Sequence, residues 1–178
     1  VKGHSYLLAA AGMVCKEYPE AVFMIAGRGE LEPDLKNQAA DLGIDKNVLF
    51  LGFRDDVHHL LQAMDVFAMS SLSEGLPVSI LEAMASKTPV VSTDVGGIKE
   101  VIRHQETGFL VRPKSPDSLA EGLIACLGED FPANYCERIV KPELDVVDTA
   151  DTDAVRDAEE VTMSVDGGDD EGTLKEKV

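Results

Sequence analysis

The sequence contains no tryptophan, only three cysteines and no long apolar run. The cysteines, at positions 15, 126 and 136, are odd in number and lack C-x-x-C spacing. This pattern argues against a disulfide framework and a zinc ribbon, and it favours the reducing cytoplasm. The longest nearly apolar stretch, 6–15, is far shorter than the roughly 20 residues that cross a bilayer, and no leader-like segment opens the sequence. We therefore expect a cytoplasmic protein without a membrane span.

Positive charge is also scarce. Lysine and arginine total 16 against 33 aspartates and glutamates, for a formal net charge of −17. Such a polyanion repels phosphodiester backbones, so we expect no nucleic-acid partner. The excess of negative charge is concentrated in 143–178, which contains 13 acidic and 3 basic side chains. This stretch has few large apolar residues to offset the entropy of ordering, so we expect 131–178 to be a divergent acidic tail, mostly disordered. An acidic arm that binds a basic partner is the alternative.

Residues 1–130 alternate between short apolar runs and amphipathic stretches. The runs predict strands, and the amphipathic stretches predict helices. Strands are expected over 21–27, 47–53, 66–70, 89–94 and 108–113, and helices over 5–18, 30–42, 55–64, 78–86, 97–103 and 116–127. Continuous apolar strands separated by helices are typical of parallel β-α-β units. The expected fold class is therefore α/β with a doubly wound parallel sheet.

Two glutamates form an E-x7-E pattern in the segment 70–100. Glu74 follows an expected strand, and Glu82 lies in the next expected helix. Sheets of this class bind ligands at the carboxyl ends of their strands, where Glu74 should lie. A carboxylate such as Glu82 can accept hydrogen bonds from two hydroxyls, as a ribose diol offers. Taken without its strand–loop–helix context, the same pattern describes a loop acid and a solvated helix residue.

The start of that helix is suited to an anion. Gly75 permits close backbone approach, and Pro77 favours a first helical turn. The N–H groups of Val78 and Ser79 should then lack partners within the helix. Such groups, together with the helix dipole, stabilise a phosphate.

Several segments, in one order from residue 2 to about residue 128, resemble a known family. They are similar to the nucleotide-sugar-binding half of retaining GT-B glycosyltransferases of the family-4 type, also called glycosyl transferases group 1. The segments are KGH (2–4), YPEAVFMIAGRGELEPDL (18–35), NVLFLGFRDD (47–56), EGLPVSILEAMA (74–85), PVVSTDVGGIKE (89–100) and GFLVRPKSPDSLAEGL (108–123). The resemblance implies a GT-B Rossmann-like domain over 1–130.

The resemblance also implies an activity and its residues. The chain would bind a UDP-sugar or GDP-sugar and take part in sugar transfer with retention of configuration, without metal or other cofactor. Lys2 and Glu74 would be catalytic, with Lys2 on the diphosphate and Glu74 on the hydroxyls of the transferred sugar. Glu82 would bind the ribose. Phe53 and Arg54 would lie near the nucleobase, and the alternative is that they are a core aromatic and a surface arginine. The remaining donor-binding positions implied are Gly75, Leu76, Pro77, Val78 and Ser79.

The family's pattern is only partly present. Members place an arginine before the lysine and an acceptor-binding domain before this one, so the resemblance implies that residues 1–130 are a part of such an enzyme and inactive by themselves. The acceptor, whether saccharide, lipid or small molecule, stays open, as does peripheral membrane association through the other half. The alternative is a non-catalytic module that binds or senses nucleotide sugar. A nucleotide-sugar epimerase fits the motifs poorly.

Other motifs predict less. The segment GRGELE (27–32) lacks the third glycine of a dinucleotide fingerprint, so a nicotinamide cofactor is not expected. His58 and His59 would point about 100° apart on a helix and cannot share one metal. Ser71 and Ser73 lie outside any G-x-S-x-G elbow, which argues against a serine hydrolase.

Overall fold

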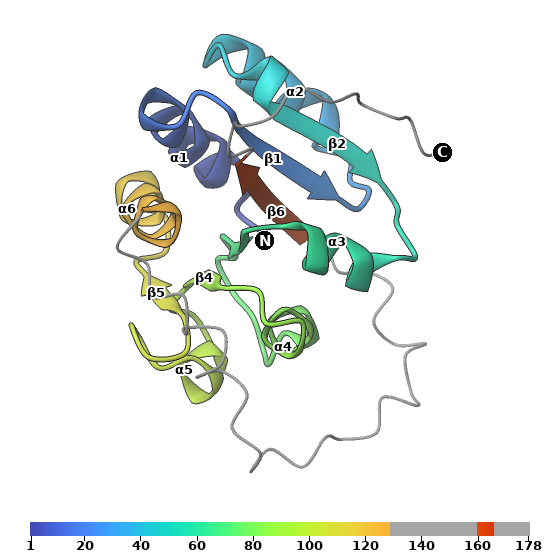
Figure 1. The fold of residues 1–178 in the computed structure, drawn as a ribbon. Helices are drawn as coiled ribbons and strands as arrows, with labels where there is room; N and C mark the ends of the chain where they lie inside the picture. Colours follow the sequence, from blue (N-terminus) through green and yellow to red (C-terminus); the bar gives the residue numbers. More distant parts are fainter. Residues whose placement is uncertain (129–159, 166–178) are drawn as a thin grey trace, which may run out of the picture.

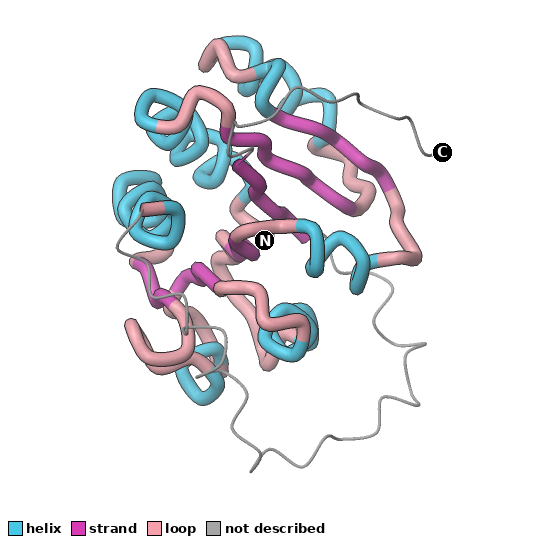
Figure 2. The backbone as a smooth tube through the Cα atoms, in the orientation of Figure 1, coloured by secondary structure: helices cyan, strands magenta, loops and turns pink. Residues whose placement is uncertain are grey.

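The computed structural model describes residues 1–128 and the backbone of residues 160–165 (Figures 1 and 2). The elements are α1 (His4–Glu17), β1 (Ala21–Ala26), α2 (Glu32–Asp41), the short 3-10 helix η1 (Asp45–Asn47), β2 (Val48–Gly52), α3 (Val57–Ala63), β3 (Val66–Met69), α4 (Val78–Ala85), β4 (Val90–Thr93), α5 (Ile98–Val101), β5 (Phe109–Val111), α6 (Pro116–Leu127) and β6 (Glu160–Val165). Through α6 this order confirms the expected alternation of helices and strands.

The strands form one sheet in the order β2-β1-β6-β3-β4-β5. β1 pairs with β2 in parallel, and β3, β4 and β5 also pair in parallel. β6 lies antiparallel between β1 and β3, and its arrow opposes that of β1 in Figure 1. β1 to β5 therefore all point the same way, which confirms the doubly wound parallel arrangement with one antiparallel strand added at its centre.

β6 differs from the expectation for the tail. All six of its residues pair with β1, so the disorder expected for 131–178 does not hold for 160–165. The sequence EVTMSV alternates polar and apolar residues, a period that favours a strand. The prediction of disorder was made from the acidic composition of the whole segment 143–178, and this six-residue pattern was therefore not recognised. The rest of the expected tail lies outside the described residues.

The sheet is covered on both faces. One hydrophobic cluster joins its first face to α1, α2 and α6, and a second joins its other face to α3, α4 and α5. Neighbouring residues of one strand divide between the two: Ala68 and Val91 lie in the first, Phe67 and Val90 in the second. In Figure 1, α1 and α6 lie beside each other on one side of the sheet. This explains the apolar runs, because strands that are covered on both faces favour apolar side chains at most positions.

Candidate functional site

The loops that follow β1 to β5 meet along one edge of the sheet, because the strands are parallel (Figure 2). Glu74 lies in the loop between β3 and α4, and Phe53 follows β2, as expected. β3 and β4 are hydrogen-bonded neighbours, so the loops after them lie close together. The positions predicted from the motifs thus belong to this edge.

The amino-terminal segment lies against the loop after β3. The Val1 carbonyl accepts a hydrogen bond from the Leu72 N–H at 2.8 Å, and the Lys2 carbonyl accepts one from the Ser70 hydroxyl at 2.9 Å. Gly3 has φ +71°, and a Cβ there would lie 2.1 Å from the Ser70 carbonyl oxygen. Glycine is required at this position, because any side chain would push the segment off the loop. Lys2 is therefore anchored beside Glu74 by backbone contacts.

Lys2 and Glu74 form an ion pair across 72 positions of sequence. The Nζ of Lys2 lies 3.1 Å from Oε1 of Glu74, and the two side chains are 27% and 13% exposed. A partly buried pair is screened less by salt than one on the open surface. An ammonium group has three donors, so Lys2 can hold Glu74 and still donate to a ligand oxygen.

Two buried hydroxyls extend the contacts of Glu74. The Ser71 hydroxyl donates to Oε1 of Glu74 at 2.6 Å, and the Thr93 hydroxyl donates to the Ser71 carbonyl at 2.6 Å. Ser71 is 1% exposed and Thr93 is 2% exposed. Sequence reasoning missed both, having weighed Ser71 only as a nucleophile. The one available signal was the spacing of three between Ser71 and Glu74, at which a short polar side chain often bonds within a loop.

Two glycines of the loop after β4 pack against the backbone of Glu74 and Gly75. The Gly97 N–H donates to the Gly75 carbonyl at 3.0 Å. Gly96 has φ +56°, and a Cβ there would lie 1.7 Å from the Glu74 carbonyl oxygen. The two glycines of the PVVSTDVGG motif therefore allow the loop after β4 to pack directly against the backbone of the loop after β3.

α4 begins at Val78, and Pro77 is its N-cap residue. Among the residues that the structure describes, no side chain caps this end of the helix. The first N–H groups of any helix have no partner inside it, and here they include those of Val78 and Ser79. Ser79 is buried, whereas Leu76 and Val78 are exposed. The helix therefore begins where the sequence predicts, and anion binding at this junction stays a prediction.

Glu82 lies one turn further along α4 and is half-buried. Burial raises the pKa of its carboxyl. Within the part of the chain that the structure describes, its carboxylate makes no hydrogen bond or ion pair. A half-buried carboxylate without a protein partner is suited to accept hydroxyl groups from a ligand.

Phe53 and Arg54 occupy a more open loop. Phe53 is 51% exposed, so it is not a core aromatic. Nε and Nη2 of Arg54 bond to the two carboxylate oxygens of Asp56 at 2.7 and 2.6 Å, and the Arg54 partner lowers the pKa of the Asp56 carboxyl. Neither Phe53 nor Arg54 bonds to Lys2 or Glu74 among the residues described.

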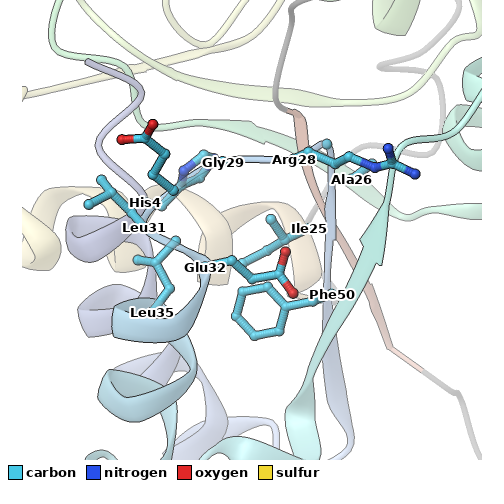
Figure 3. Close-up of a pocket in the computed structure, with 11 residues that line it drawn as sticks. His4, Ile25, Ala26, Arg28, Gly29, Leu31, Glu32, Leu35 and Phe50 are labelled. Atoms are coloured by element: carbon cyan, nitrogen blue, oxygen red, sulfur yellow. The ribbon is translucent and has the colours of Figure 1, made fainter.

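A pocket of about 270 Å³ opens at the carboxyl end of β1 (Figure 3). Its lining comes from β1, the following loop, the start of α2, β2 and α1: His4, Ile25, Ala26, Gly27, Arg28, Gly29, Glu30, Leu31, Glu32, Leu35 and Phe50. Lys36 pairs with Glu32 at 2.6 Å and lies 5.3 Å from the ring centre of Phe50. The GRGELE segment, discounted as a dinucleotide fingerprint, thus forms one wall of a pocket at the carboxyl edge of the sheet.

His4 joins this pocket to the Lys2 segment. It is buried, and burial, with the nearby charge of Lys2, lowers its pKa from 6.5 to about 4. The imidazole is therefore neutral at pH 7, which keeps a second positive charge away from Lys2.

Two further properties of the described residues bear on function. They contain no group of three or more histidine, cysteine, aspartate or glutamate side chains that could hold a metal ion. Across residues 1–128 and 160–165, no helix has the length and apolar character needed to cross a membrane.

The fold and its carboxyl edge define an α/β domain of the nucleotide-binding type, in which a lysine and a glutamate meet before an uncapped helix. Residues 1–141 match the family glycosyl transferases group 1, and the chain belongs to this family. The resemblance to glycosyl transferases group 1 that the motifs carry is thereby confirmed.

Relatives and solved structures agree with this assignment. The chain is 38% identical over 107 residues to the Escherichia coli UDP-Gal:alpha-D-GlcNAc-diphosphoundecaprenol alpha-1,3-galactosyltransferase, covering 60% of this chain and 28% of that protein. It is similar to Anabaena Alr3699/HepE in complex with UDP-glucose, with a TM-score of 0.72 and 30% identity over 78% of this chain and 39% of that one.

A third comparison concerns an isolated domain. The C-terminal domain of the glycosyl transferase group 1 family protein LpcC from Francisella tularensis has a TM-score of 0.65 and 28% identity, over 78% of this chain and 73% of that one. The chain spans about a third of the length of the curated relatives it matches.

Proposed function

We propose that this chain is the donor-binding part of a glycosyltransferase that uses a nucleotide-diphosphate sugar and retains the configuration of the transferred sugar. The Lys2–Glu74 pair at the uncapped start of α4 is the observation that carries the proposal. UDP is favoured over GDP as the nucleotide, because the E. coli relative is named for UDP-Gal and the Anabaena structure contains UDP-glucose.

The diphosphate would lie between Lys2 and the start of α4. Lys2 keeps donors beyond the one that faces Glu74, and the N–H groups of Val78 and Ser79 are aligned with the helix dipole. As the bond between the anomeric carbon and the diphosphate breaks, negative charge develops on the leaving oxygen. Positioned donors stabilise that charge, so this chain would supply leaving-group stabilisation without a metal ion.

The two glutamates would bind the two sugars of the donor. Glu74 lies beside the diphosphate position and would accept hydroxyls of the transferred sugar, while Glu82 would accept the ribose diol. Gly75, Leu76 and Pro77 would supply backbone contacts, and the exposed Phe53 with Arg54 would lie near the nucleobase. A cytoplasmic location remains a prediction from the cysteine pattern.

Calorimetry of the chain with UDP and with GDP, in EDTA, tests this assignment. We expect binding without magnesium, and Glu82→Ala should weaken it by about 1.5–3 kcal/mol, the range for hydrogen bonds to a charged group. Glu121→Ala is a matched control, because Glu121 is an exposed helical glutamate on α6, on the opposite face of the sheet. Equal affinities for wild type and Glu82→Ala would refute the ribose assignment, and a requirement for magnesium would refute metal-independent binding.

A further inference from the structure

The two oxygens of the Glu74 carboxylate have different surroundings. Oε1 accepts hydrogen bonds from Lys2 at 3.1 Å and from Ser71 at 2.6 Å. Oε2 has no hydrogen-bond partner within residues 1–128. The carboxylate is therefore held through one oxygen, and the other is left for a ligand.

Ser71 is in turn held by the sheet. It lies two residues beyond the end of β3, and the hydroxyl of Thr93, the last residue of β4, donates to its carbonyl at 2.6 Å. β3 and β4 pair directly, with Met69 opposite Ser92, so the anchor of Ser71 is a paired strand rather than a loop. Both hydroxyls are buried, so water cannot readily replace either bond.

We propose that Ser71, fixed by Thr93, is a positioning residue that orients the Glu74 carboxylate so that Oε2 faces the hydroxyls of the transferred sugar. This rests on the proposed function, in which Glu74 contacts that sugar. A hydroxyl-to-carboxylate bond of 2.6 Å is short and charge-assisted, and it removes rotational freedom that the sugar would otherwise have to freeze on binding. Without Ser71, Lys2 becomes the one remaining partner of the Glu74 carboxylate among the described residues, and the carboxylate can rotate away from the orientation that faces the sugar.

The proposal has a signature that a loss of folding does not share. UDP has no transferred sugar, so the orientation of Glu74 should affect the affinity for a UDP-sugar more than that for UDP. We define the sugar increment as the Kd of UDP divided by the Kd of the UDP-sugar. Calorimetry with UDP, UDP-glucose, UDP-galactose and UDP-N-acetylglucosamine on the wild-type chain identifies the sugar with the largest increment.

Ser71→Ala should lower that increment roughly 3- to 10-fold, less than the loss of a charged hydrogen bond made to the ligand itself, because Glu74 stays in place, and it should leave UDP affinity nearly unchanged. Ser71→Thr retains a hydroxyl and should restore most of the increment. Thr93→Val should lower it by a smaller factor. Thr88→Val is a matched control, because Thr88 is also a buried threonine whose hydroxyl donates to a carbonyl, that of Leu61, at 2.6 Å. It should leave the increment intact whatever it does to stability.

A double-mutant cycle with Glu74→Gln decides whether Ser71 acts through Glu74. We expect Ser71→Ala to have no further effect on the increment in the Glu74→Gln background. An equal effect in both backgrounds, or equal losses of UDP and UDP-sugar affinity, would overturn the proposal in favour of a structural role. Wild-type binding of UDP with no increment for any sugar would also overturn it while leaving nucleotide binding intact. Absence of UDP binding would instead overturn the proposed function itself.

Discussion

The loop after β3 and the loop after β2 lie at the same edge of the sheet but are built differently. The first is tied to the amino-terminal segment, to β4 and to the Gly96–Gly97 turn by hydrogen bonds and close packing. The second contains a half-exposed Phe53 and a local Arg54–Asp56 pair. The proposed diphosphate and sugar end of the site is therefore preorganised, whereas the proposed nucleobase end is open.

The positions of the two strands explain this difference. β3 lies between β6 and β4, and all four of its residues are buried. β2 is an edge strand that pairs with β1 on one side, and most of its residues are partly exposed. A loop that leaves a central strand meets neighbours on both sides, while one that leaves an edge strand meets fewer. Groups that must stabilise developing charge benefit from the first environment, because fixed donors need no reorganisation.

Among the predictions, the largest effect on the preorganised loop after β3 is expected from Gly96→Ala. The residue has φ +56°, and the new Cβ would lie 1.7 Å from the Glu74 carbonyl oxygen, so strain and overlap both act. We expect a loss of about 3 kcal/mol in the free energy of unfolding, measured by urea denaturation. Gly43→Ala is the control, because Gly43 has φ +70° but nothing within 4 Å of its Cβ position. It should lose only about 1 kcal/mol from backbone strain, and equal losses would contradict the close approach.

Low pH should reduce the free energy of unfolding through His4, which follows the anchored segment of Lys2 and Gly3. Its pKa falls from 6.5 in the unfolded chain to about 4 in the fold, so between these values the unfolded chain binds a proton that the folded chain does not. Stability from this residue is fully present above pH 6.5 and is lost as pH falls toward 4, by up to about 3 kcal/mol. Urea denaturation from neutral to acid pH should show that His4→Gln flattens this dependence. Replacing the exposed His58 with glutamine should preserve it, and an unchanged dependence in His4→Gln would assign it to other groups.

The difference between the two loops can be tested by measuring the UDP affinity of one variant in each. Lys2→Ala should lower UDP affinity roughly 10- to 100-fold, because it removes the proposed cationic partner of the diphosphate from a partly buried position. Arg54→Ala should lower it less than about threefold, because Arg54 is exposed and already pairs with Asp56. Calorimetry at low and moderate salt measures both. Similar losses would show that the open loop contributes as much as the preorganised one.

Local pattern was sufficient for most of the fold. The segments 21–27 and 89–94 became β1 and β4 because a strand buried on both faces favours apolar residues at most of its positions. Pro77 and the helix after it were placed within one residue. The helix expected over 97–103 is shorter, α5 covering Ile98–Val101. β6 was missed because its six residues lie in a segment whose composition is dominated by acids.

For the site, the E-x7-E pattern identified Glu74, whereas Lys2 came from the family resemblance alone, which implied related roles for the two residues. Nothing local shows that Lys2 contacts Glu74, or that Thr93 holds Ser71, because these pairs are 72 and 22 positions apart. Gly3 and Gly96 likewise have their reason in carbonyl oxygens of distant loops.

The sequence by itself determined the α/β class, the strands and helices through α6, and the edge at which polar loops gather, since each depends on periodicities of a few residues. Only the tertiary structure determined that the loop after β3 contacts the amino-terminal segment and the loop after β4. Strand order places β3 beside β4 and leaves β2 at the edge, and that order arises from long-range packing of the two hydrophobic clusters rather than from any local pattern. The hydrogen bonds that orient Glu74 exist only because those packed strands bring Lys2, Ser71 and Thr93 to one place.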